Sequence, residues 1–420
     1  MSRAWKWAGV TVGISLGVLA ILTLPGWADE LQPNVVDQLQ KRLDDGSATL
    51  AFGADGHGYL PDLLKALHIS RDSQLLVFSA SSLQFDRINQ KTPRAIYYQD
   101  DVAVGDVQDG RFIEIVTSDP QSGVAFYTLD RSKTDKPHFV RRSSECLGCH
   151  GLASRWAPGM MVASYSTGPD GKVLNLDPSR LFPLTDDRTP FETRYGGWYV
   201  TGTTGTMQHR GNVTFDELKP WEVPAGGLNI TSLADRIDLK RYLEPGSDIV
   251  SLLTLEHQTG FVNLITRINA QYRSLDKGDG APGQRATSKD IDESVDELIA
   301  YMTFKNEVPL PSPVKGTSTF TTTFPAAGPR DPQGRSLRQF NLKTRLFRYP
   351  LTYMIYSQSF DNLNAQARDR VLHGVYASLQ GAGANGAAAI NILAATRKGL
   401  PDFWRPVPEP GSIPAQGELK

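Results

Sequence analysis

The only two cysteines of this chain lie three residues apart in one short segment. Cys146 and Cys149 are the sole cysteines among 420 residues, and His150 follows directly, in the run Ser-Glu-Cys-Leu-Gly-Cys-His-Gly. A disulfide between the two would close a loop of very few residues and would constrain little of the unfolded chain. All of the thiol chemistry of the chain is therefore concentrated in one motif that also contains an imidazole.

The spacing within this motif matches the chemistry of covalent haem attachment. Two thiols three positions apart can add to the two vinyl groups on one edge of a porphyrin and hold the ring through two thioethers. A neutral imidazole nitrogen is the ordinary proximal ligand of haem iron, and His150 is tethered beside the ring. We therefore predict one covalently attached haem c, with Cys146 and Cys149 as the attachment residues and His150 as an iron ligand.

Two other kinds of site also use a Cys-x-x-Cys pair. A thioredoxin-like redox dithiol does not need the histidine that follows. A structural zinc site needs four ligands, so the chain would have to recruit two distant histidines or carboxylates. Both alternatives stay open, but only the haem interpretation gives every residue of the motif a role.

The N-terminus is typical of an exported protein. A basic start is followed by an apolar stretch over residues 7–24, and the small residues Gly26 and Ala28 suit cleavage by a signal peptidase. We predict a signal peptide over residues 1–28 and a periplasmic mature protein, because covalent haem attachment generally takes place outside the bacterial cytoplasm. The alternative is an uncleaved anchor, since about 17 to 25 apolar residues can span a bilayer. No later stretch of the sequence is long and apolar enough to cross a membrane.

Composition and charge are those of a globular protein. Hydrophobic residues make up 40% of the chain, and 44 basic side chains balance 45 acidic ones, which argues against nucleic acid as a partner. At roughly 100 to 200 residues per domain the mature chain has room for two domains. We predict an α+β fold, with a haem-binding region of mixed structure over residues 29–225 and a mainly helical region over residues 226–420.

Local patterns predict individual elements. Short β-rich segments separated by turns predict an antiparallel meander, formed by residues 74–79, 95–99, 112–116 and 124–129. A further hairpin over residues 160–174 and a strand over residues 197–201 are also expected. Apolar residues at helical spacing predict a long helix over residues 248–273 with Ser247 as its N-cap. Shorter helices are expected at residues 34–43, 290–304, 363–380 and 387–398.

The second axial position of the iron decides between electron transfer and ligand chemistry. His209 is a candidate because it lies in a glycine-flanked turn, where backbone can approach a cofactor. His257 is a candidate because it interrupts an otherwise apolar helix, and a polar group there needs a partner. Either residue can equally be a core histidine, and Met160 or Met161 is an alternative sulfur ligand. An iron with no second protein ligand is a further alternative.

Haem propionates need cationic or hydrogen-bonding partners. Arg141 and Arg142 lie just upstream of the cysteines, and an arginine fork matches the geometry of a carboxylate. A charged, solvated face would have the same sequence. We expect both arginines to contribute to cofactor binding.

Several segments together resemble a known family. These are the haem motif, the run Asp-Arg-Thr-Pro-Phe-Glu-Thr-Arg-Tyr-Gly-Gly-Trp-Tyr-Val-Thr-Gly from Asp187, Gly-Arg-Ser-Leu-Arg-Gln-Phe from Gly334, and Leu-Phe-Arg-Tyr-Pro from Leu346. With them the chain resembles exported bacterial cytochrome c domain-containing proteins of unassigned function. A haem motif placed after a sheet is similar to haem-bearing PAS or Cache domains and to P460-type cytochromes. No signalling module follows the motif, however, and the lysine crosslink of P460 enzymes cannot be assigned in this chain.

The expected function is electron transfer by a periplasmic mono-haem c-type cytochrome with an unknown redox partner protein. One haem accepts or delivers a single electron. The size of the chain keeps two alternatives open, because a simple carrier domain requires only roughly 100 residues. These alternatives are a haem enzyme acting on peroxide or nitrogen oxides at an open iron, and a redox sensor or a sensor of a small-molecule ligand.

Overall fold

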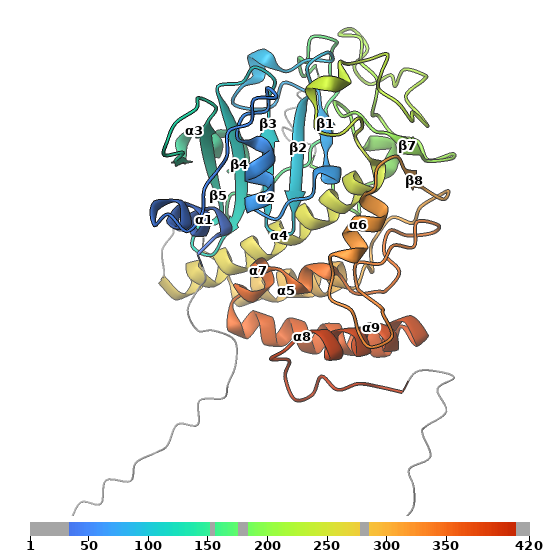
Figure 1. Cartoon of the computed structure of the whole chain (residues 1–420). Helices are drawn as coiled ribbons and strands as arrows, with labels where there is room; N and C mark the ends of the chain where they lie inside the picture. The colour runs from blue at the N-terminus through green and yellow to red at the C-terminus, as the bar shows by residue number, and fades with distance from the viewer. Residues whose placement is uncertain (1–32, 152–155, 175–183, 278–284, 409–420) are drawn as a thin grey trace, which may run out of the picture.

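An antiparallel sheet and a set of helices make up the chain in the computed structural model, which describes residues 33–151, 156–174, 184–277 and 285–408 (Figure 1). The predicted signal peptide, residues 1–28, lies outside these ranges. The predicted α+β class is confirmed, since the sheet occupies the N-terminal part and helices dominate the C-terminal part. No helix in the described ranges is both long enough and apolar enough to span a membrane.

The sheet is a simple meander in which each strand pairs with the next along the chain. It has six strands, β1 (Leu75–Val77), β2 (Arg94–Gln99), β3 (Val102–Asp106), β4 (Phe112–Asp119), β5 (Gly123–Asp130) and β6 (Phe139–Arg142). All neighbouring pairs are antiparallel, as the turn residues between the predicted strands indicate. The sequence pattern found four of these strands and missed β3 and β6. Both are short, and β6 ends in two arginines, which are common on an edge strand.

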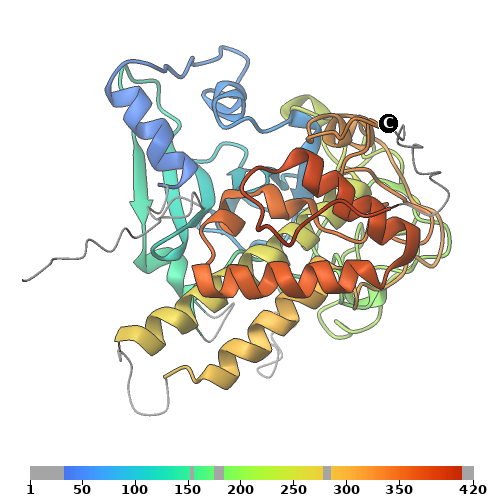
Figure 2. The same cartoon turned by 90° about the horizontal axis from the view of Figure 1, so that it is seen from below.

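Alternation of side chains along the strands gives the sheet two buried faces. One face, which includes Tyr97 and Tyr127, packs against α1 (Val35–Asp44) and α2 (Leu60–Ala66). The opposite face, which includes Val77 and Phe126, belongs to the core that contains α4 (Ile249–Lys277) (Figures 1 and 2). The sheet is therefore covered on both sides, and most of its strand residues are buried.

The C-terminal helices pack in succession onto α4. Neighbours in this series are α4, α5 (Ser288–Met302), α8 (Ala365–Gln380) and α9 (Gly383–Thr396). The shorter α6 (Phe320–Ala326) and α7 (Gln358–Asp361) also contact α4 (Figure 2). One hydrophobic cluster joins these helices to strands β1, β2 and β5. This core crosses the predicted boundary at residue 225, and separate folding of the two regions stays a prediction.

The start of α4 differs from the prediction by one residue. Asp248, not Ser247, accepts the backbone N–H groups of Val250 and Ser251, at 2.7 and 3.3 Å. Ser247 instead accepts the N–H of Leu76 at 2.9 Å. The serine therefore ties the sheet to the helix, a role that depends on a partner far away in the sequence.

The predicted hairpin over residues 160–174 and the strand over residues 197–201 are not regular strands. The described part of these segments contains only isolated bridges, such as Ala163 with Leu184 and Val77 with Trp198. The two segments still lie side by side, since the N–H of Tyr165 donates to the carbonyl of Gly196 at 2.9 Å. They form a layer of irregular backbone over the sheet, and a short strand β7 (Gly202–Thr203) pairs with β8 (Lys315–Gly316) beyond it.

Candidate functional site

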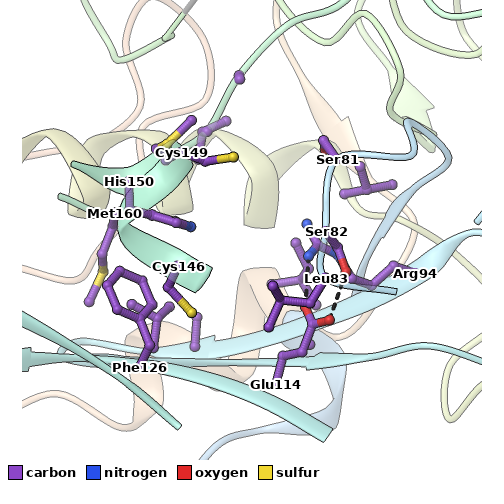
Figure 3. Close-up of a pocket in the computed structure, with 18 of the residues that line it drawn as sticks. Ser81, Ser82, Leu83, Arg94, Glu114, Phe126, Cys146, Cys149, His150 and Met160 are labelled. Atoms are coloured by element: carbon purple, nitrogen blue, oxygen red, sulfur yellow. Dashed lines mark hydrogen bonds and ion pairs between the residues drawn. The ribbon is translucent and has the colours of Figure 1, made fainter. Parts of the chain in front are cut away.

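The predicted haem motif forms a short helix at the edge of the sheet. Strand β6 ends at Arg142, and helix α3 (Ser144–His150) follows almost directly. Residues at positions i, i+3 and i+4 of a helix share one face, so Cys146, Cys149 and His150 point the same way. All three line one cavity between α3 and the sheet (Figure 3).

This cavity has a volume of about 420 Å³. Ligand sites in proteins measure roughly 300 to 1,000 Å³ and are mostly apolar. The floor is the sheet face that carries Ile96, Ala103, Val116 and Phe126, and the opposite walls include Met160, Met161, Val162, Trp198 and Leu255. An apolar cavity beside the motif is the environment that a porphyrin ring requires.

The ring of His150 is oriented by one hydrogen bond and by packing on Phe126. Its Nδ1 lies 2.7 Å from the carbonyl oxygen of Gly159, to which it donates when protonated there. A hydrogen bond donated by Nδ1 selects the tautomer in which Nε2 carries the lone pair. Burial lowers the pKa of His150, although the hydrogen bond to Gly159 acts in the opposite direction. The neutral imidazole is therefore favoured, and its ring packs on Phe126 with centroids 4.6 Å apart.

Both cysteines carry free thiols. Cys146 is half-buried, and burial together with the charge of Glu114 raises its pKa to about 11. Cys149 is exposed at the rim of the same cavity. Within the described ranges no three His, Cys, Asp or Glu side chains gather to hold a metal ion. A haem needs fewer protein ligands, because the porphyrin supplies four nitrogens and the protein only axial groups.

The two arginines proposed for the propionates lie on opposite faces of the sheet. Arg142 pairs with Phe126 and Arg141 with Tyr127, so only Arg142 shares the face of the cavity. Arg142 donates to the Oγ1 of Thr128 at 3.0 Å. Neither arginine is among the residues that line the cavity, and Arg141 points away from it because neighbouring residues of a strand point in opposite directions.

Arg141 has partners of its own on the far face. It forms an ion pair with Asp119 at 3.6 Å, and its guanidinium lies over the ring of Tyr127. Two consecutive arginines in a sequence do not show that their side chains lie on opposite faces, because that follows only once the segment is known to be a strand.

His209 is buried away from this cavity. Its Nδ1 accepts the N–H of Gly211 at 3.1 Å, and its ring meets Tyr195 edge-on with centroids 5.8 Å apart. It is not among the residues that line the cavity of His150. The structure therefore gives His209 a packing role and does not place it opposite His150.

His257 is also separated from the cavity, and both of its ring nitrogens have partners. Nδ1 lies 2.7 Å from Asp187 Oδ2, and Nε2 lies 2.7 Å from Thr352 Oγ1. The ring stacks on Tyr301 with centroids 5.0 Å apart and is fully buried. The polar position that the sequence suggested for haem contact is satisfied inside the helical core.

We expect the burial of His209 to make the stability of the protein depend on pH. Burial lowers the pKa of His209 from 6.5 to about 4, so the unfolded chain binds a proton more readily than the folded one. The stabilisation is complete above pH 6.5 and is lost as the pH falls toward 4, by about 3 kcal/mol for this group. Urea unfolding of the wild type and of His209→Asn, measured across this range, isolates the contribution. The prediction fails if the two pH profiles run parallel.

Sequence reasoning missed a polar cluster in the wall of the cavity. Arg94 on β2 and Glu114 on β4 form an ion pair at 3.1 Å, and Ser82 donates to the same carboxylate at 2.7 Å (Figure 3). Both charged residues line the cavity. Arg94 lies one residue before the predicted strand 95–99, and the pair reaches across β3. The sequence signals this cluster only through Arg94, which lies two positions before Ile96 and therefore on the same face of the strand.

The candidate methionines do lie at the site. Met160 and Met161 both line the cavity. Met160 is held to α4 by the side chain of Asn263, which accepts its N–H and donates to its carbonyl, both at 2.9 Å. Among the described lining residues, the sulfur atoms of these methionines are the available alternative to a second histidine ligand.

Comparisons with protein-family models, with curated proteins and with solved structures find no match to this chain.

Proposed function

We propose that this chain is an exported, periplasmic c-type cytochrome that carries one covalently attached haem and transfers single electrons to or from a partner protein. The observation that carries the proposal is the geometry of His150. Its Nδ1 is held by Gly159, and the ring faces an apolar cavity that also receives both thiols of the motif. A redox dithiol would need neither His150 nor the cavity, and a zinc site would not need the cavity.

The roles of the residues follow from this arrangement. When bound, the haem would supply the ferric–ferrous couple that takes up and releases one electron. Cys146 and Cys149 would hold the porphyrin through thioethers, and His150 would be the proximal ligand. The apolar residues of the floor and walls would exclude water from the haem.

Exposure near the motif supports electron transfer. Cys149 is exposed, and Leu147 between the two cysteines is 41% exposed. Phe85, which lines the cavity, is 62% exposed. The thioether edge of the porphyrin would therefore lie near the surface, where a partner can approach within the short distance that electron tunnelling needs.

Met160 or Met161 would hold the iron together with His150. A thioether opposite an imidazole raises the reduction potential and suits an electron carrier. His209 and His257 are engaged elsewhere, whereas Met160 and Met161 lie in the cavity. One of these two methionines would therefore be the second protein ligand of the iron.

A pair of methionine variants tests this assignment. We expect the reduced wild type, produced with a haem-attachment system, to show a low-spin c-type spectrum that carbon monoxide barely changes. One of Met160→Ala and Met161→Ala should bind carbon monoxide at least about tenfold more readily, because it opens the iron, and the other serves as the matched control. The measurement is the absorption spectrum of ferrous protein with and without carbon monoxide. If the wild type binds carbon monoxide as readily as both variants, the iron has no methionine ligand.

That outcome would favour the second candidate, a haem enzyme acting on peroxide or nitrogen oxides or a haem-based sensor. One observation supports this second candidate. Among the described residues that line the cavity, His150 is the only histidine, and the cavity wall carries the polar groups of Arg94, Glu114 and Ser82. Charged and hydroxyl groups beside an open iron are suited to binding a small polar ligand.

A further inference from the structure

We propose that Arg94 binds a haem propionate through its guanidinium. The inference rests on the proposed haem function and goes beyond it, because it names a cofactor-binding residue on a part of the chain far from the motif. It also gives Arg94 the role that the sequence suggested for Arg141.

Arg94 is held in place by a carboxylate whose oxygens are already occupied. Its Nη1 lies 3.1 Å from Glu114 Oε2, and Oε1 of Glu114 accepts from Ser82 at 2.7 Å and from Gln84 Nε2 at 3.2 Å. The side chains of Arg94 and Glu114 are only 17% and 16% exposed. An ion pair this well enclosed fixes the direction of the guanidinium fork.

The strand between them leaves room for this pair. Arg94 and Glu114 belong to β2 and β4, and β3 passes between these strands with Gly105 at the crossing. A Cβ at Gly105 would lie 3.5 Å from Cδ of Arg94 and 3.7 Å from Cβ of Glu114. Arg94 therefore crosses β3 within ordinary contact distance of Gly105, along the wall of the cavity.

Donors of Arg94 remain available for a second anion. Within the described part of the chain, Glu114 engages Nη1 of Arg94, and Nη2 is not among the buried polar atoms that lack a partner, so it keeps access to the cavity. A carboxylate is the group that a guanidinium fork matches best, and Glu114 occupies only one of the donors.

The position of Arg94 in the cavity agrees with the shape of the cofactor. In a haem, the vinyl groups that react with cysteines and the two propionates lie on different edges of the porphyrin. In Figure 3 Arg94 and Glu114 lie across the cavity from His150 and Phe126. A ring attached through α3 would therefore extend its carboxylates toward the polar side of the cavity, where Arg94 lies.

The reduction midpoint potential of the haem-loaded protein tests the proposal. We expect Arg94→Gln to shift the ferric–ferrous equilibrium toward ferric by roughly tenfold, about 59 mV for one electron, because the propionate loses its neutralising charge. Arg94→Lys keeps the charge without the fork and should shift the equilibrium in the same direction by less. Arg141→Gln is the matched control, since it removes the same charge on the other face of the sheet and should leave the potential near that of the wild type.

The outcomes separate this inference from the proposed function. If the wild type never acquires haem, the proposed function fails and this inference fails with it. If the wild type carries haem but Arg94→Gln and Arg94→Lys keep the wild-type potential, only the inference is overturned. It is also overturned if added acetate shifts the wild-type potential and the Arg94→Gln variant does not respond, because Arg94 would then be free to take a dissolved carboxylate.

Discussion

The double variant Cys146→Ala/Cys149→Ala is expected to keep no haem bound after denaturation. The chain has no other cysteine, so no other thiol can form a thioether with a porphyrin. In the wild type the haem should stay with the polypeptide on a denaturing gel and in acidic acetone. In the double variant any haem held by His150 and the apolar cavity alone should be extracted completely, because only covalent attachment resists unfolding.

A neighbouring residue supplies the control for this experiment. Gly148 lies between the two cysteines in α3, and a Cβ at this position would meet no atom within 4 Å. Gly148→Ala should therefore keep the wild-type haem content while changing the same helix. The single variants Cys146→Ala and Cys149→Ala should retain haem through one thioether. Colourless wild-type protein from cells with a working maturation system, or a double variant that keeps its haem on the gel, would contradict the prediction.

Removal of Arg194 is expected to destabilise the fold by about 3 to 5 kcal/mol, because it leaves a buried carboxylate without its counter-ion. Arg194 and Glu256 form an ion pair at 2.9 Å, and their side chains are 1% and 0% exposed. Tyr195 donates to the same carboxylate oxygen at 2.7 Å. Arg194 also donates to the backbone carbonyls of Asp187 and Thr189, so one side chain joins the segment of residues 187–194 to helix α4.

Three variants distinguish the loss of a buried counter-ion from the loss of any single charge. Arg194→Met should lower the free energy of urea unfolding by the amount given above, and the double variant Arg194→Met/Glu256→Met should recover much of it. Lys172→Met is the exposed control, since Lys172 and Glu217 pair at 3.1 Å with side chains 62% and 66% exposed. Its cost should stay below about 1 kcal/mol. Equal midpoints for Arg194→Met and Lys172→Met would contradict the argument.

Local sequence patterns were sufficient to predict the elements whose structure depends on residues close in the sequence. The meander was predicted because alternating apolar strands and their turns lie next to one another along the chain, and α4 because its apolar residues recur at helical spacing. The same reasoning missed β3 and β6, which are short strands whose pairing comes from their neighbours in the sheet. It placed the N-cap of α4 at Ser247, but the hydroxyl of Ser247 instead accepts a hydrogen bond from the N–H of Leu76.

The irregular layer over the cavity was not predictable in this way. Residues 160–165 have the composition of a strand, but the partners that fix them are Gly196 and the side chain of Asn263 in α4. Hydrogen bonds between segments distant in the sequence, 103 residues apart for Met160 and Asn263, leave no periodic signal in either segment. For the same reason the sequence could not show that His257 is satisfied by Asp187 and Thr352.

Residue spacing alone was enough to show that the two thiols and the imidazole of the motif share one face once the segment is helical. Local periodicity was also enough for the α+β class. Which residues share the cavity with the motif could be seen only in the folded chain. The fold excludes His209 and His257 from the cavity, places Arg141 on the far face of β6, and brings Arg94 and Glu114 together across β3. Strand register and the packing of segments distant in the sequence set these contacts, and neither leaves a signal in the local sequence.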